Sequence, residues 1–328
     1  MLDWLGKPVW MWLGFMAVVA VLLALDLGVL HRKAREIGVG ESLRLSAFYL
    51  VLGLAFGGWV WSELGAQAGK EYVTGFIVEK SLAMDNVFVI AMIFTYFAIP
   101  RQYQHKVLFW GILGVIVLRG IMIGLGATLV SQFGWVLYIF AAFLIFTGIK
   151  MWIMADHEPD IGANPVLRFV RRRFRIADQL HGDRFWVKLP DANTGRIATF
   201  MTPLFLALIL VEIVDLVFAV DSVPAIFAIT TDPYIVYTSN IFAILGLRAL
   251  YFALSAMVHR FTYLKYALAV LLVFIGSKIF VADFLLGTSK FPVAWSLGVT
   301  FAILAAGVGY SLWKTRGVAP APAVTTSG

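Results

Sequence analysis

A pattern of charged residues within apolar segments occurs twice in this chain. The first copy reads VEKSLAMDNVF (78–88), LRG (118–120) and FTGIK (146–150), and the second reads VDLVFAVDSVPAIF (214–227), GLRAL (246–250) and FIGSK (274–278). Both copies begin with two acids that are six residues apart, Glu79 and Asp85 in one and Asp215 and Asp221 in the other. Duplicated helical units with charged groups near the middle of the membrane are typical of secondary transporters. The pattern therefore indicates transport of an ion or a small solute.

Composition and the spacing of apolar residues predict an all-α integral membrane protein. Hydrophobic residues make up 61% of the chain and charged residues only 14%, which is too apolar for a soluble domain of 328 residues. Stretches long enough to cross about 30 Å of hydrocarbon indicate about nine transmembrane helices. These predicted spans are 9–30, 43–62, 72–97, 107–131, 134–154, 201–229, 234–257, 263–286 and 292–313.

Lysine and arginine residues are unevenly divided between the two sets of connections. One set holds 18 of them, in 31–44, 98–106, 155–200, 258–265 and 314–328. The other set holds only Lys7, Lys70 and Lys290. Because connections rich in these residues remain in the cytoplasm, we predict that the amino terminus lies outside and the carboxyl terminus in the cytoplasm.

This orientation makes the two copies inverted relative to each other, because their first spans enter the membrane from opposite sides. The repeats take in the third to fifth spans (72–154) and the sixth to eighth spans (201–286), within a single membrane domain, 1–316. The connection 155–200 is expected to be cytoplasmic, with arginines that favour anionic lipids and a hairpin near its end. The tail 317–328 has the composition of a disordered segment.

Polar residues inside the spans are the candidate site residues. An ionised side chain in hydrocarbon costs several kcal/mol, so these groups must face the interior of the bundle or a wet cavity. The candidate cation ligands are Asp85, Asp221, Glu79, Asp215, Asn86, Glu212 and Asn240, and the candidate charge-pairing or gating residues are Arg119, Lys150, Arg248 and Lys278. Two interpretations remain open: the acids and bases of the repeats form structural ion pairs, or the acids bind and release a cation.

Helical geometry refines this expectation. Glu79 and Asn86 are seven residues apart and so share one helix face, as do Asp215 and Ser222. Pro224 cannot donate a backbone hydrogen bond, so we expect a local break that frees a carbonyl beside the second acid of that repeat. Inverted repeats further predict that Asp85 and Asp221 come close together.

The donors in the spans suit a hard cation. The chain has no cysteine, and its five histidines fall at connections, so carboxylate, amide, hydroxyl and carbonyl oxygens remain. Such ligands favour Mg²⁺, Ca²⁺ and Mn²⁺, with Met84 as a possible softer contact. The sequence contains no catalytic or cofactor motif, so we expect neither enzyme activity nor a resident cofactor. We expect membrane lipids, the cation and protons as partners, and no nucleic acid; oligomeric state is left open.

Long strings of polar and apolar residues resemble one known family. GFIVEKSLAMDNVFV, LIFTGIKM and FAVDSVPAIFAITTDPYIVYTSNIFAILGLRALYF are similar to the TerC family of bacterial membrane proteins, closest to its Alx-type members. The resemblance implies a LysE-like multi-span protein of the bacterial cytoplasmic (inner) membrane that exports Mn²⁺. It assigns the five acids and two amides of the candidate set to this activity. Family members tied to membrane biogenesis keep open the alternative of an assembly or scaffold factor with structural charges.

Overall fold

The computed structural model describes residues 3–28, 39–154, 161–162, 164–190, 196–255, 263–285 and 292–316. The tail 317–328, the turn 191–195 and most of the acidic stretch 156–162 lie outside these ranges. The long helices are α1 (Val9–Gly28), α2 (Val39–Tyr96), α3 (Arg101–Gln132), α4 (Val136–Ile153), α6 (Pro203–Phe227), α7 (Pro233–Leu245), α8 (Leu247–Ser255), α9 (Leu264–Phe280) and α10 (Val293–Lys314). Seven helical segments in this part of the chain are long and apolar enough to cross a membrane.

The 58-residue α2 is two helices joined at a sharp kink. Gly65 has φ 90° and ψ 169°, a conformation that a residue with a side chain rarely adopts. The two halves then run antiparallel, because Gly53 lies against Phe76 and Gly57 against Tyr72. These halves coincide with the predicted spans 43–62 and 72–97.

Two other predicted spans are interrupted. The span 234–257 consists of α7 and α8, which meet at Gly246, and the span 263–286 ends in a π-helical turn, η2 (Val281–Leu285). The break expected at Pro224 is absent, since α6 continues through this residue to Phe227. The proline lies so close to the end of α6 that a regular last turn accommodates it.

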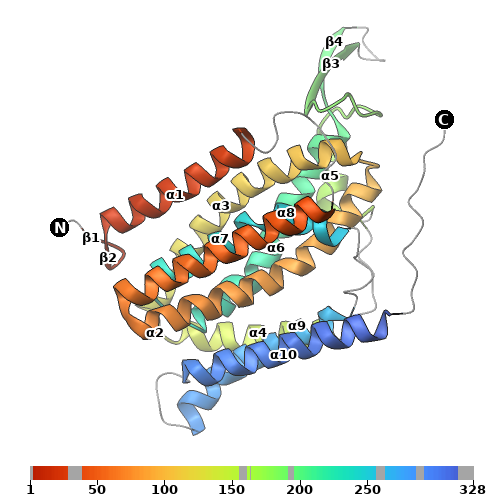
Figure 1. Cartoon of the computed structure of the whole chain (residues 1–328). Helices are drawn as coiled ribbons and strands as arrows, with labels where there is room; N and C mark the ends of the chain where they lie inside the picture. Colours follow the sequence, from red (N-terminus) through yellow and green to blue (C-terminus); the bar gives the residue numbers. More distant parts are fainter. Residues whose placement is uncertain are drawn as a thin grey trace.

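The helices form two groups (Figure 1). The combined segment α7–α8 is buried almost throughout and is surrounded by α1, α2, α3 and α6, whereas α4, α9 and α10 form a separate layer beneath them. Both α6 and α7 begin with a proline preceded by a capping side chain, Thr202 and Asp232 respectively. Large apolar side chains are exposed on the outer helices, as expected for surfaces that face lipid.

A close contact between α4 and α9 uses one glycine from each helix. A methyl group added at Gly148 would lie 2.7 Å from the carbonyl oxygen of Ala269, and one added at Gly276 would lie 2.5 Å from that of Ala141. Each glycine thus meets the residue seven positions before its counterpart. The contact is reciprocal, and the two glycines occupy the same place in the repeated FTGIK and FIGSK motifs.

The connection between α4 and α6 contains α5 (Pro165–Arg173) and a two-stranded ribbon, β3 (Trp186–Pro190) and β4 (Ile197–Met201). The predicted hairpin is therefore confirmed. Together with β1 (Asp3–Trp4) and β2 (Lys7–Pro8), it shows that the chain is not purely α-helical. Lys106 holds the ribbon segment to α3 through Asp183, at 2.9 Å, and this hydrogen bond lowers the pKa of the Asp183 carboxyl.

Substituting either contact glycine tests the packing of α4 on α9. Gly148→Ala and Gly276→Ala are each expected to lower stability by about 1–3 kcal/mol, because the methyl group overlaps backbone atoms of the facing helix. The melting temperature of the detergent-solubilised protein measures this loss. Gly124→Ala is the control, since open space surrounds that position in α3. Equal melting temperatures for all three variants and the unmodified protein would contradict the contact.

Candidate ion-binding site

A buried arginine lies at the centre of the helices. Arg119, near the middle of α3, has only 1% of its surface exposed. Its Nη1 donates to Glu79 and lies 2.9 Å from Ser222 Oγ and 3.0 Å from Asn240 Oδ1. Its Nη2 and Nε face the two carboxylate oxygens of Asp215, at 3.3 and 3.4 Å. One guanidinium therefore connects α2, α6 and α7 through α3.

The partners of Arg119 meet because of their helical spacing. Glu79 and Asn86 lie on one face of α2, and Asp215 and Ser222 on one face of α6, as their seven-residue separations predict. Asn86 closes the ring by donating from Nδ2 to Asp215 Oδ1 over 3.1 Å. All four side chains are buried.

The charges in this cluster do not cancel. Two carboxylates, Glu79 and Asp215, share the single guanidinium of Arg119. The neighbouring Lys80 does not compensate, because its Nζ donates instead to the carbonyl of Ala243 near the end of α7, at 3.1 Å. A low-dielectric interior makes such an imbalance costly, and either a proton on one carboxylate or an additional cation relieves it.

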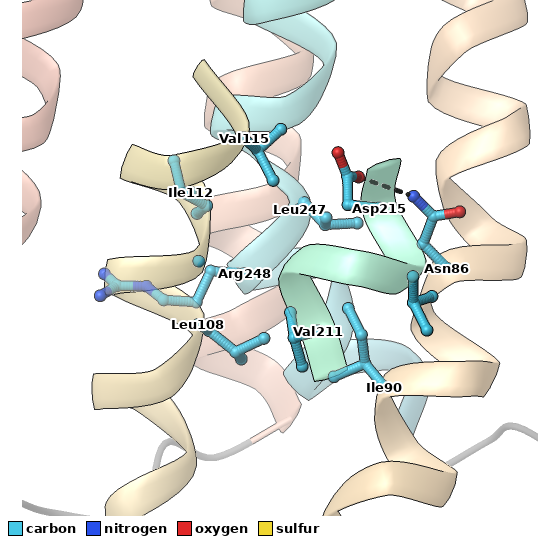
Figure 2. A pocket seen from close by; sticks show the side chains of 11 residues that line it. Asn86, Ile90, Leu108, Ile112, Val115, Val211, Asp215, Leu247 and Arg248 are labelled. Carbon is cyan, nitrogen blue, oxygen red and sulfur yellow. Dashed lines mark hydrogen bonds between the residues drawn. The ribbon is translucent and has the colours of Figure 1, made fainter. Parts of the chain in front are cut away.

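Unpaired acceptors and two cavities adjoin the cluster. Glu79 Oε2 and Asn86 Oδ1 have no hydrogen-bond partner among the described atoms. One cavity is lined by apolar side chains of α3 and α6 and reaches Asn86 and Asp215; Figure 2 shows their hydrogen bond at its edge. A second cavity, of about 30 Å³, is lined by Glu79, Asn86, Asp221, Ser222 and Met151, among others. Asn86 borders both cavities, so it stands between them.

Some predicted site residues lie outside the cluster. Asp221 borders the second cavity and interacts with Thr147 and the exposed Lys150 of α4. The Glu212 carboxylate packs against Gly114 of α3, and its Oε2 has no partner among the described atoms. The side chain of Asp85 lies outside the described part, so its predicted approach to Asp221 remains a prediction.

Pairing between the acids and bases of the repeats, one of the two interpretations left open by the sequence, is seen for Arg119 in the described part of the chain. Arg119 forms ion pairs with Glu79 and Asp215, the first acids of the two repeats. Lys278 instead lies 3.1 Å from Ser296 Oγ of α10. The Arg248 guanidinium points away from Asp215 in Figure 2.

The described side chains contain no group of three acidic or histidine residues arranged to hold a metal ion. Arg119 occupies the space between Glu79 and Asp215, which separates the carboxylates that a metal would bridge. The sequence interpretation also missed Met151 and Thr147, which reach the Asp221 region from α4. The signal was present, since both lie in or beside the repeated FTGIK motif.

Replacing Arg119 tests whether it balances the buried acids. Arg119→Gln is expected to destabilise the protein by about 3–5 kcal/mol, because Glu79 and Asp215 lose their buried counter-charge. Adding Glu79→Gln to this variant removes one of the two stranded charges and should restore part of the melting temperature. Lys150→Gln, at an exposed site, should have little effect. A single Arg119→Gln variant that melts like the unmodified protein would refute this role.

The comparisons with known proteins agree with this architecture. Residues 64–319 match the model of the integral membrane protein TerC family. A relative from Escherichia coli (strain K12), named "Putative membrane-bound redox modulator Alx", is 46% identical over 96% of this chain and 100% of its own length. An "Uncharacterized membrane protein" from Rickettsia felis is 47% identical over 90% of this chain and 95% of its own. No solved structure matches. The chain is therefore a multi-pass integral membrane protein that belongs to the TerC family.

Proposed function

We propose that this protein exports divalent metal cations across the bacterial cytoplasmic membrane, with Mn²⁺ as the main substrate and protons in exchange. One observation carries the proposal: a buried cluster with more carboxylates than cations contains unpaired oxygens, and the residues that carry them line a cavity. Structural ion pairs alone do not require such unpaired acceptors, whereas a site that binds and releases a cation does.

The second cavity supplies suitable ligands. Glu79 Oε2 and Asn86 Oδ1 accept no hydrogen bond within the part of the chain that the structure describes, and Asp221 and Ser222 line the same cavity. Carboxylate, amide and hydroxyl oxygens are hard donors that suit Mg²⁺, Ca²⁺ and Mn²⁺. The choice of Mn²⁺ among these ions extends to this chain what the sequence resemblance implies.

Arg119 serves in this proposal as an internal counter-charge. The ionised groups Glu79, Asp215 and Asp221 together with Arg119 leave two negative charges, which one divalent cation neutralises. When the cation leaves, Arg119 retains Glu79 and Asp215, and protons compensate the remaining charge. Lys150 interacts electrostatically with Asp221 from an exposed position. It therefore modifies the affinity of the site for the cation and is not one of the groups that bind it.

The finer architecture belongs to the same proposal. We place nine spans in the membrane, with the two halves of α2 crossing separately and α7–α8 crossing as one interrupted helix. Spans 3–5 and 6–8 form the inverted repeat, and the amino terminus lies outside. The reciprocal contact of Gly148 and Gly276 supports this arrangement, because equivalent residues of inverted repeats meet around a pseudo-two-fold axis.

The alternative is a membrane-protein assembly or scaffold factor with structural charges. The bonds that hold Arg119 between two acids favour this alternative, since they stabilise contacts among four helices. The name of the Escherichia coli relative raises redox modulation as well. This chain contains no cysteine, so any such effect here would not use a thiol of its own.

Loss of one carboxylate from the candidate ligand set is expected to abolish export. Glu79→Gln, Asp221→Asn and Asp85→Ala should each leave Mn²⁺ at the level of cells without the protein, because an amide or methyl group cannot supply the negative charge. Cells that lack other manganese exporters would carry each variant, and accumulated Mn²⁺ would be measured after a manganese load. Membrane expression of each variant is checked in parallel.

Two control variants separate loss of a cation ligand from a general effect of substitution. Lys150→Ala should impair export less than the acidic variants, and Asp183→Asn, in the connection between α5 and β3, should leave export unchanged. If the Glu79, Asp221 and Asp85 variants all clear Mn²⁺ as well as the unmodified protein, these acids are structural. That result would favour the scaffold alternative over transport.

The orientation has its own test. Reporter domains fused after Gly287 and after Gly317 should be found outside and in the cytoplasm respectively, because 18 of the lysines and arginines in connections lie on the proposed cytoplasmic side. The reverse locations would refute both the orientation and the proposed direction of the repeats.

A further inference from the structure

A methionine lines the second cavity beside residues that carry oxygen donors. Met151 of α4 lines it together with Glu79 and Asn86 of α2 and Asp221 and Ser222 of α6. Met151 lies on α4, which belongs to the other layer of helices (Figure 1), and it lines the cavity that Arg119 also borders. Its position directly follows Lys150 at the end of the repeated FTGIK motif.

Two residues that line this cavity each carry a buried oxygen without a hydrogen-bond partner among the described atoms, which favours a ligand there. Glu79 and Asn86 are 1% and 3% exposed, and Glu79 Oε2 and Asn86 Oδ1 lack a partner in the described part of the chain. Both residues line the cavity. A volume of about 30 Å³ holds a water molecule or an ion stripped of most of its hydration shell. An ion of that kind must replace its lost water with the side chains around it.

The chemistry of the lining side chains determines which ions can replace their hydration water with protein ligands. Oxygen ligands serve Mg²⁺, Ca²⁺ and Mn²⁺ alike, so they discriminate weakly among them. A thioether is a soft ligand that gains little from Mg²⁺ or Ca²⁺ and more from transition-metal ions and Cd²⁺. A single thioether beside hard donors therefore shifts the preference of the site away from the abundant alkaline-earth ions.

We propose that Met151 is a specificity-determining residue whose sulfur makes the cavity prefer Mn²⁺ and softer divalent cations over Mg²⁺ and Ca²⁺. This inference rests on the proposed function, in which the cavity binds the exported cation. It goes beyond that function by assigning the selectivity to one side chain outside the cluster of acids.

Met84 provides a matched comparison. The sequence analysis named it as the softer contact, yet its side chain packs against apolar side chains of two core clusters. Met151 packs against one of the same clusters but also borders the cavity. The two methionines thus share an apolar environment and differ in access to the ligand.

The test measures ion selectivity in liposomes that contain the purified protein. Mn²⁺ transport would be recorded against Mn²⁺ concentration and in competition with Cd²⁺ and with Mg²⁺. Met151→Leu keeps the size of the side chain and removes the sulfur. It should raise both the inhibition constant of Cd²⁺ and the half-saturating Mn²⁺ concentration by about tenfold. The inhibition constant of Mg²⁺ should stay unchanged, and the maximal rate of Mn²⁺ transport should stay within about twofold.

Two further variants separate the sulfur from packing. Met84→Leu should leave all these values within about twofold of the unmodified protein. Met151→Ala should change the ratio of Cd²⁺ to Mg²⁺ inhibition as much as Met151→Leu does, because both lack sulfur. If Met151→Leu keeps the original ratio, or lowers transport of all ions equally, the inference is overturned and Met151 acts through packing. If the unmodified protein does not transport Mn²⁺, the proposed function itself fails.

Discussion

The interaction on which the rest of the structure depends is the set of bonds around Arg119. A guanidinium cannot be left without partners in the apolar centre of a helical membrane protein, because no water is present to solvate it. Glu79, Asp215, Ser222 and Asn240 supply those partners from three different helices. The arrangement of α2, α6 and α7 around α3 is therefore set by electrostatics as much as by apolar packing, and it brings the unpaired oxygens to one place.

Glycines allow the helices to approach closely enough for this arrangement. The kink at Gly65 folds α2 back on itself, so that its second half carries Glu79 and Asn86 into the centre. The reciprocal contact of Gly148 and Gly276 holds α4 against α9 and thereby fixes the layer that contributes Met151. The cavity lies where the two layers meet, because residues of α2, α3 and α6 line it together with Met151 of α4 and Leu272 of α9.

Much of this could be predicted from the sequence because membrane helices have strong signals. Hydropathy located the helical segments, and the seven-residue spacing predicted that Glu79 would share a face with Asn86, and Asp215 with Ser222. Pairing across helices could not be predicted, because it depends on how each helix is rotated. The sequence gives no sign that Lys80 turns to a carbonyl of α7 or that Lys278 turns to Ser296. The place of Met151 beside the cavity also depends on how α4 is rotated. A methionine in a membrane helix is usually a packing residue, so its sequence position alone did not indicate a role.

Ion accumulation in liposomes with the purified protein tests the central claim most directly, because no other cellular component is present. With a pH gradient imposed across the liposome membrane, the account predicts Mn²⁺ accumulation that collapses when the gradient is dissipated. It also predicts no accumulation with the Asp221→Asn protein. Liposomes with correctly folded protein that accumulate no Mn²⁺ under any gradient would contradict the account and leave the buried charges as structural elements of the fold.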